Sequence, residues 1–451
     1  MEQISLLEAY KFTKEYKKML PKERVQLRKR RMFELLNFAR ANSPLYKELY
    51  KGIKGNFTIK DLPTVSKDML LSNYDSWSTD SAVTFADMSA HLETGSSKEY
   101  LDRYSIVSSG GSEGNPLLHL YDDNCGRVMS IAYASRIFSR REYFWKFLFK
   151  GGRIASIYSE NEIFFENVFA SMRKKYLPFR EDKSITLKAQ SGTENLSVAL
   201  NSFAPAILAG FPSVLVRLAD AKRSGALKIA PVFIVADGEP LEKEVREQIS
   251  SAFGCDVISS YSSAISGCIA YECREHHLHL NDDWLIVEAV DNMGNTVPSG
   301  KPSDKVLITN LLNYTQPIIR YELGDRIVVH DKPCLCGNVS PWIEIMGRTL
   351  DQIRFVVGPR EIIVPIADID AVLKGEDYLD RYQIIVNPNN HLELRLTGAG
   401  DTDKTMAFFK AERKLRSYMR SIGILAPMIT LDKEDPKPHP VSGKYQTVII
   451  P

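Results

Sequence analysis

The residues with the clearest chemical signal are the glycines and hydroxyls of a nine-residue stretch at positions 108–116 (SSGGSEGNP). The stretch lies between a short apolar strand at Ile106 and Val107 and a second strand predicted from Leu117 to Tyr121. Glycine permits backbone turns that are closed to other residues, and successive backbone amides and serine hydroxyls can donate hydrogen bonds to an anion. The stretch therefore predicts a phosphate-binding loop, with a plain polar surface loop as the alternative.

The same stretch has a second, hydrolytic interpretation. Its glycines fit the Gly-x-Ser-x-Gly turn of serine hydrolases, which makes Ser112 a candidate nucleophile. Such an enzyme needs a later histidine, and the histidine considered for this role, His439, lies between two prolines. The stretch matches neither the lysine-bearing phosphate loop nor the dinucleotide fingerprint.

Composition excludes several classes of protein. The 451 residues are 44% hydrophobic and 25% charged with a net charge of +2, which is typical of a globular protein and gives no field that favours nucleic acid. A basic run at 22–31 is interpreted as the solvated face of a helix. We expect no membrane span, no signal peptide and a cytoplasmic location. Six cysteines are too few for a disulfide scaffold.

The elements that must position the loop alternate along the first three quarters of the chain. Helical spacing covers residues 6–50 and breaks at Asn42-Ser43-Pro44. Buried strands are predicted at 153–158, 206–211, 232–237 and 257–261, with a helix that ends at Gly254. This alternation predicts an α/β domain of parallel sheets with flanking helices.

The pattern changes near residue 280. Strands predicted at 284–290, 306–311 and 326–330 indicate a β subdomain at about 280–345. The final segment has a predicted helix at 367–373, strands at 382–386 and 392–396, and a long helix near 404–421. We therefore expect an N-terminal domain at 1–347 and a small α+β domain at 348–451.

Five further motifs follow the glycine loop in order. They stand at 236–241 (ADGEPL), 261–264 (YSSA), 317–325 (PIIRYELGD), 347–351 (GRTLD) and 442–444 (SGK). Over essentially the whole chain, this ordered set resembles the adenylate-forming (acyl-activating, AMP-binding) superfamily. It most resembles the phenylacetate-CoA ligase branch, which includes capsule-cluster relatives. The resemblance implies that fold, with a C-terminal domain that is mobile.

The resemblance also implies the site residues. The nucleotide-binding residues are Ser109, Gly111, Ser112, Glu113, Gly114, Gly238, Glu239, Pro240, Tyr261, Ser262 and Asp325. The acid pocket lies near Tyr158, Phe211 and Pro212, and the catalytic residues are Lys444 and Arg348. For Tyr261 and Phe211, an ordinary place in the core is the alternative.

Each implied role suits the chemistry. A carboxylate must attack the α-phosphorus of ATP, and two anions repel each other, so the site needs donors and cations. In the family the glycine loop surrounds the β- and γ-phosphates, and the residue matching Tyr261 packs on adenine. Asp325 accepts from the ribose hydroxyls with Arg348 assisting, and Lys444 brings its ammonium to the reacting oxygens.

Three positions depart from the family pattern. Ile265 stands where a glutamate usually helps to hold Mg²⁺, which wants oxygen ligands. Glu113 stands in the loop where threonine is typical, and we hypothesise that it partly replaces the missing ligand. Leu350 occupies the usual acidic hinge position, with Asp351 beside it. A degenerate protein that binds nucleotide without turnover is therefore kept as an alternative.

Cysteine and histidine residues form a candidate metal site. Cys273, His279, Cys334 and Cys336 supply three thiols and an imidazole, a set that suits tetrahedral zinc. Some members of the phenylacetate-ligase branch carry a structural metal at matching positions, which strengthens the hypothesis. His276 and His277 are rivals for the fourth ligand, and Cys268 is expected in the core.

The resemblance implies activation of an aryl or acyl carboxylic acid to an acyl-adenylate, then transfer to a thiol such as coenzyme A. Transfer to an amine and adenylyl transfer are alternatives. The expected cofactors are ATP, Mg²⁺, structural Zn²⁺ and coenzyme A. The expected partners are the acid and its acceptor, and a homodimer is compatible with the sequence.

Overall fold

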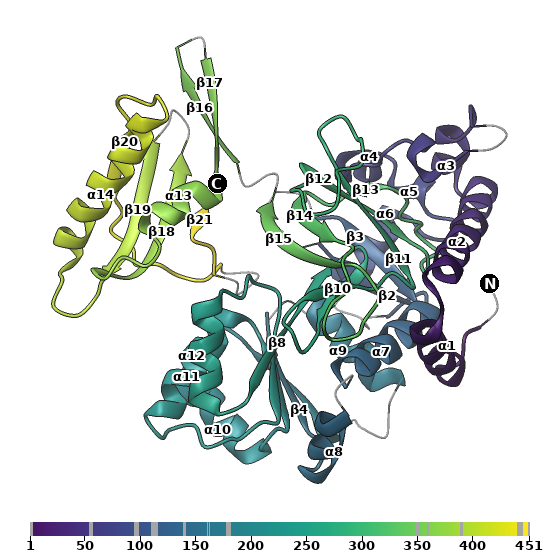
Figure 1. Ribbon diagram of the computed structural model, residues 1–451, viewed down its shortest axis with the longest axis horizontal. Helices are drawn as coiled ribbons and strands as arrows, with labels where there is room; N and C mark the ends of the chain where they lie inside the picture. Colours follow the sequence, from purple (N-terminus) through teal and green to yellow (C-terminus); the bar gives the residue numbers. More distant parts are fainter. Residues whose placement is uncertain are drawn as a thin grey trace. The chain divides into compact units, whose positions relative to one another are not determined.

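The computed structural model describes residues 3–53, 57–93, 99–109, 116–138, 141–159, 161, 163–176, 182–348, 352–358, 360–387, 391–439 and 445–449. The described residues form two compact units (Figure 1). The larger unit contains residues 1–323, 327–345 and 441–443, and the smaller unit contains residues 324–326, 346–440 and 444–451. No helix in the described ranges has the length and hydropathy that a membrane crossing requires.

The parallel half of the larger unit is a doubly wound sheet. Its strands are β4 (Ile154–Tyr158), β5 (Ser184–Lys188), β6 (Ile207–Gly210), β7 (Phe233–Ala236) and the first half of β8 (Asp256–Ser263). The connecting helices are α9 (Phe165–Tyr176), α10 (Thr193–Phe203), α11 (Pro212–Arg223) and α12 (Lys243–Phe253). The predicted α/β fold class is confirmed. The predicted helix end is confirmed as well, because Gly254, with a φ of +65°, caps α12.

The order of these strands places a switch point between β4 and β6. In space the order is β8-β7-β6-β4-β5, so the chain adds β5 on one side of β4 and β6 on the other. In open α/β sheets the connections diverge at such a point, and ligands bind outside the carboxyl ends of the two strands. This edge is where the fold favours a ligand.

Strand β8 extends the sheet in a different manner. Its second half pairs antiparallel with β9 (Gly267–Glu272), which pairs with β10 (Leu278–Leu280). Strands β15 (Trp342–Arg348) and β14 (Asp325–His330) follow, so that nine described strands share one sheet. The region expected as a β subdomain thus divides, because only β11 (Leu285–Val290), β12 (Lys305–Asn310) and β13 (Tyr321–Glu322) form their own antiparallel sheet.

Helices and a small antiparallel sheet complete the larger unit. The break predicted near Pro44 is confirmed, because Ser43 ends one helix and its hydroxyl accepts from the Tyr46 N–H at the start of the next. A three-stranded antiparallel sheet consists of β1 (Glu99–Tyr100), β2 (Tyr104–Ser108) and β3 (Leu118–Asp122), and β2 and β3 form the hairpin that flanks the glycine loop. The helices are α1 (Leu6–Lys18), α2 (Pro21–Asn42), α3 (Pro44–Leu49), α4 (Lys67–Ser72), α5 (Tyr74–Trp77), α6 (Phe85–Glu93), α7 (Asp123–Ile137) and α8 (Arg141–Phe149), with a 3₁₀ turn at Ile59–Asp61.

The smaller unit has its own sheet and core. Strands β20 (Met428–Leu431), β19 (His391–Gly398), β18 (Leu379–Asn387) and β21 (Val448–Ile449) lie in that order. Helices α13 (Ile366–Leu373) and α14 (Lys404–Ser421) accompany them, and β16 (Gln352–Val357) and β17 (Arg360–Pro365) form a hairpin (Figure 1). Ala407, Ala411 and Leu415 of α14 pack on Leu392 and Leu394 of β19. This is the α+β arrangement that the sequence predicted.

Buried ion pairs tie the helices to the turn after β10. Arg136 of α7 bonds both carboxylate oxygens of Asp283 at 2.6 Å, and both side chains are buried. Arg24 and Arg28 of α2 lie against the neighbouring Asp282. A buried charge without its partner is strongly destabilising, so these pairs fix how α2 and α7 pack on the sheet.

We predict that Arg136→Met destabilises the larger unit by about 3–5 kcal/mol, because it leaves the Asp283 carboxylate buried and unpaired. Urea unfolding measures the change. Arg223→Met is the matched control, since its pair with Asp220 is exposed and such pairs contribute at most about 1 kcal/mol. Equal effects of the two substitutions would contradict the prediction.

Candidate functional site

Three predicted or neighbouring residues meet at the carboxyl edge of the parallel sheet. Tyr158 ends β4, Phe211 follows β6, and Asp237 follows β7. The Tyr158 hydroxyl donates to Asp237 Oδ2 at 3.2 Å, and the Tyr158 and Phe211 rings meet edge to face with centroids 5.5 Å apart. Burial, and then the Asp237 charge, raise the pKa of Tyr158, so the hydroxyl stays protonated and donates.

Both rings are core residues as well as edge residues. Tyr158 is 5% exposed and Phe211 is fully buried, within the cluster that includes Leu208 and Phe233. Pro212 is also buried, at the first position of α11. These three residues are therefore buried beneath the carboxyl edge. The alternative of a core role for Phe211 is consistent with its burial.

Gly238 is required by its surroundings. Its φ is +78°, in the region that disfavours side chains, and a Cβ built on it would lie 2.7 Å from the Phe211 ring. The same Cβ would lie 3.2 Å from Glu166 Oε1 of α9. The backbone at Gly238 therefore lies close against the Phe211 ring, and only glycine fits.

Glu239 is held by a residue that the sequence did not indicate. The Ser213 N–H and hydroxyl donate to the two carboxylate oxygens of Glu239, each at 2.9 Å. Ser213 is the second residue of α11, so the contact also satisfies a free amide at a helix start. The only available signal was the Pro-Ser pair after an apolar strand, which is typical of a helix beginning.

The glycine loop is closed at its base by Ser109. The Ser109 N–H donates to the Leu117 carbonyl at 2.9 Å, and the Leu117 N–H donates to Ser109 Oγ at 2.8 Å. The Ser108 N–H donates to the Ile163 carbonyl at 2.8 Å, just before α9. The predicted strands on either side of the loop are confirmed as β2 and β3. The loop residues Gly111, Ser112, Glu113 and Gly114 lie outside the described residues.

The turn after β8 is apolar where the family usually places a magnesium ligand. Tyr261 is partly buried and packs on the cluster around Ile269, and the neighbouring Ser262 pairs with Cys268 across β9. Ile265 is 4% exposed and shares a cluster with Trp77 and Ile318. Position 265 is thus occupied by core packing and offers no oxygen ligand.

The Arg-Tyr-Glu-Leu-Gly-Asp motif is anchored by its arginine. Arg320 has φ of +50°, and its guanidinium bonds Glu288 Oε2 at 3.1 Å and the Lys60 carbonyl at 3.1 Å. Asp325 begins β14 and is 8% exposed. The sequence indicated Asp325 but not the structural role of Arg320. Pro240 is exposed, two residues after Gly238. Lys444 and the side chain of Arg348 lie outside the described part of the chain.

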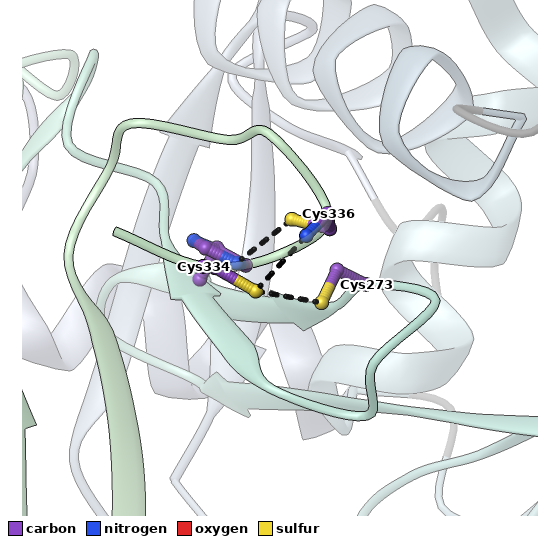
Figure 2. A group of neighbouring side chains, drawn as sticks. Cys273, Cys334 and Cys336 are labelled. Atoms are coloured by element: carbon purple, nitrogen blue, oxygen red, sulfur yellow. Dashed lines mark hydrogen bonds between the residues drawn. The ribbon is translucent and has the colours of Figure 1, made fainter. Parts of the chain in front are cut away.

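The four predicted metal ligands converge. The ligand atoms of Cys273, His279, Cys334 and Cys336 all lie within 4.8 Å of one another. Cys273 Sγ is 3.8 Å from Cys334 Sγ, and Cys336 Sγ is 3.3 Å from His279 Nε2. Figure 2 shows the three cysteines turned toward a common point. Cys273 directly follows β9, His279 lies in β10, and the segment between β14 and β15 supplies the other two.

The imidazole of His279 is oriented for coordination. Its Nδ1 lies 2.8 Å from the Ser340 carbonyl, which makes Nδ1 the donor and directs the lone pair of Nε2 to the cysteines. Burial lowers the pKa of His279, which keeps the ring neutral. His277 Nδ1 is 3.3 Å from Cys334 Sγ, but its ring stacks on Trp342 at 4.0 Å, and His276 bonds Arg246 instead. The geometry favours His279 among the three histidines.

The surroundings of the three cysteines favour metal-bound thiolates over free thiols. Burial raises the pKa of Cys273, and it raises the pKa of Cys336 to about 12. Backbone N–H groups of Glu275, Cys336 and Asn338 point at the three sulfurs, at 3.3–3.5 Å. Such donors stabilise thiolates, and a divalent cation would displace the thiol protons.

Comparisons with known proteins agree with this architecture. No protein-family profile matches the chain. Protein CapK of Staphylococcus aureus is 23% identical over 411 residues, which is 87% of this chain and 82% of CapK. Indoleacetate–lysine synthetase of Pseudomonas savastanoi is 30% identical over 155 residues, 33% of this chain and 35% of that enzyme.

A solved structure covers nearly the whole chain. The crystal structure of 2-hydroxyisobutyryl-CoA ligase in its postadenylation state, bound to R3-HIB-AMP, superposes with a TM-score of 0.69 and 17% sequence identity. The match covers 96% of this chain and 90% of the ligase. The chain therefore has the fold of the adenylate-forming enzymes, and the resemblance to that superfamily predicted from its sequence is confirmed.

Proposed function

We propose that this protein activates a carboxylic acid with ATP. The observation that carries the proposal is the carboxyl edge of the parallel sheet, where Gly238 and Glu239 are held against Phe211 and Ser213 in a fold shared with a CoA ligase. The base of the glycine loop, closed by Ser109, lies on the hairpin tied to the start of α9. These are the positions that the resemblance assigns to adenine and phosphate.

The proposed reaction is an exchange of groups at phosphorus. A carboxylate oxygen attacks the α-phosphorus of ATP, the bond to the bridging oxygen breaks, and pyrophosphate leaves with the electron pair. Lys444 places its ammonium beside the reacting oxygens, and Asp325 and Arg348 hold the ribose. The acceptor then attacks the acyl carbon and releases AMP.

A thiol is the first choice of acceptor. The superposed ligase has also been solved with 2-HIB-AMP and CoA in its thioesterification state, which supports coenzyme A. The similarity to an indoleacetate–lysine synthetase favours an amine as the second candidate, and adenylyl transfer is the third. Mg²⁺ is proposed as the counterion of ATP, with Glu113 as a candidate ligand because Ile265 offers none.

We predict that the protein catalyses exchange of pyrophosphate into ATP that depends on a carboxylic acid, assayed over aryl and fatty acids. Lys444→Ala should slow the exchange by about 100-fold or more, because it removes the cation from the developing charge. Lys433→Ala, on an exposed lysine of the same unit, is the control and should have no effect. ATP binding without exchange for any acid would favour the degenerate binder.

Gly238→Ala should weaken ATP binding by about tenfold or more. The added Cβ overlaps the Phe211 ring, which shifts the backbone at 238–240 that the resemblance assigns to adenine. Gly254→Ala is the matched control. It carries a similar backbone penalty of about 1 kcal/mol at φ +65°, but nothing lies within 4 Å of its Cβ. Calorimetric titration with ATP compares them, and equal affinities would argue against nucleotide at this edge.

We also propose that Cys273, His279, Cys334 and Cys336 bind a structural zinc ion. Four protein ligands would fill a tetrahedral zinc site and leave no position for substrate, so the proposed role of the metal is structural and not catalytic. The ion would join β9 and β10 to the segment before β15.

Purified protein should contain about one zinc ion per chain by elemental analysis. His279→Ala and Cys336→Ser should each weaken zinc binding by more than about 100-fold, since loss of a ligand exceeds the 10–100-fold effect of an outer partner. Cys255→Ser is the control, because that thiol lies outside the cluster. Loss of zinc in His277→Ala with retention in His279→Ala would assign the fourth ligand to the rival histidine.

A further inference from the structure

Helix α8 is apolar on both of its faces. Tyr143 and Phe147 form the inner face, where the Tyr143 ring stacks on Phe233 with centroids 5.0 Å apart. Trp145 and Phe149, four residues apart, lie on the outer face and are 57% and 86% exposed. Large apolar helix residues are normally buried, whereas those on the outer face of α8 are exposed within the described part of the chain.

Two further apolar side chains enlarge the outer face. Phe144 and Leu148 are exposed as well, so four large apolar residues within six positions meet solvent. Phe144 packs edge to face on Trp145 at 5.6 Å. Their i, i+4 neighbours on the helix are Leu148 and Phe149, so the four residues occupy adjacent positions on one face. Isolated exposed apolar residues are ordinary, but a contiguous group marks an interaction surface.

The charges around this face are mainly basic. Lys146 and Lys150 are exposed on the same stretch, and Arg153 follows at the start of β4. Lys183 and Lys228, also exposed, precede β5 and β7 at the same edge of the sheet. Glu142, Asp182 and Asp256 are among the described acidic residues near this edge, and Asp256 accepts from the Tyr143 hydroxyl. Aromatic side chains flanked by lysines match an anionic lipid surface, with rings at the headgroup level and cations on phosphate.

We propose that the outer face of α8 docks the protein on anionic lipid bilayers. A second copy of the chain is the less favourable occupant, because a twofold contact would bring the lysines of both copies together. Helix α8 leads into the amino end of β4, whereas the candidate site lies at the carboxyl edge. Figure 1 shows α8 at the periphery of the larger unit, so docking leaves the site accessible within that unit.

Tryptophan fluorescence provides a direct test. Of the four tryptophans, Trp77 is fully buried, Trp284 and Trp342 are partly buried, and Trp145 is on the docking face. Vesicles of phosphatidylcholine with phosphatidylglycerol should shift the Trp145 emission to shorter wavelength, and brominated lipid should quench it. The protein should bind more weakly to vesicles of phosphatidylcholine alone, and more weakly to the anionic vesicles at high salt.

Phe149→Glu should lower partition into anionic vesicles by more than about tenfold, measured by co-sedimentation. Lys146→Glu should also weaken binding, and Phe409→Glu, at an exposed phenylalanine of α14, should not. Binding that is absent, or unaffected by Phe149→Glu, would overturn the proposal. A dimer in solution that Phe149→Glu dissociates would assign the face to a second copy and overturn it as well.

Discussion

Strand β8 pairs with a parallel neighbour on one side and an antiparallel neighbour on the other, and Glu272 holds that junction. The Ser259 N–H of β8 donates to Glu272 Oε2 at 2.8 Å, and Arg246 of α12 bonds both carboxylate oxygens. Burial alone would raise the pKa of Glu272, but the hydrogen bonds from His276 and Arg246 lower it, so the carboxylate stays charged. The β8–β9 strand pair thereby connects the parallel sheet to the cysteine cluster, since Cys273 follows Glu272.

Two carboxylates at the carboxyl edge accept hydrogen bonds from neighbouring side chains. Asp237 and Glu239 flank Gly238, and each carboxylate accepts hydrogen bonds from the protein, from Tyr158 and from Ser213. Carboxylates engaged in this way are oriented by the protein's donors, which limits their repulsion of a polyanionic ligand. The fixed orientation of these groups is what electrostatic preorganisation requires.

Local signals predicted much of the fold. The helix near 404–421 is observed at Lys404–Ser421, and Gly254 ends α12 as its position predicted. Strand β5 was missed because its sequence, SITLK, is polar and half exposed. Strands β9 and β10 were also missed, although one proposed metal ligand, Cys273, directly follows β9 and another, His279, lies in β10. Periodicity identifies a strand but not its neighbours, so the addition of β14 and β15 to the large sheet was beyond reach of the sequence.

The long-range contacts could not be predicted from the sequence either. The Arg136–Asp283 pair, the Ser213–Glu239 contact and the Ser340 carbonyl beside His279 join residues that are 26 to 147 positions apart. The cysteines and His279 were found because their chemistry is rare and specific. Ser213 and Ser340 are common residues whose roles depend only on where the chain brings them.

The most direct test of carboxylate activation follows an oxygen atom. The protein is supplied with ATP, an acceptor and carboxylic acids labelled with ¹⁸O in the carboxylate, and the AMP formed is examined by mass spectrometry. If a carboxylate oxygen attacks the α-phosphorus, AMP retains one ¹⁸O after the acyl group leaves. AMP without label, or formation of ADP in its place, would contradict the proposed acyl-adenylate.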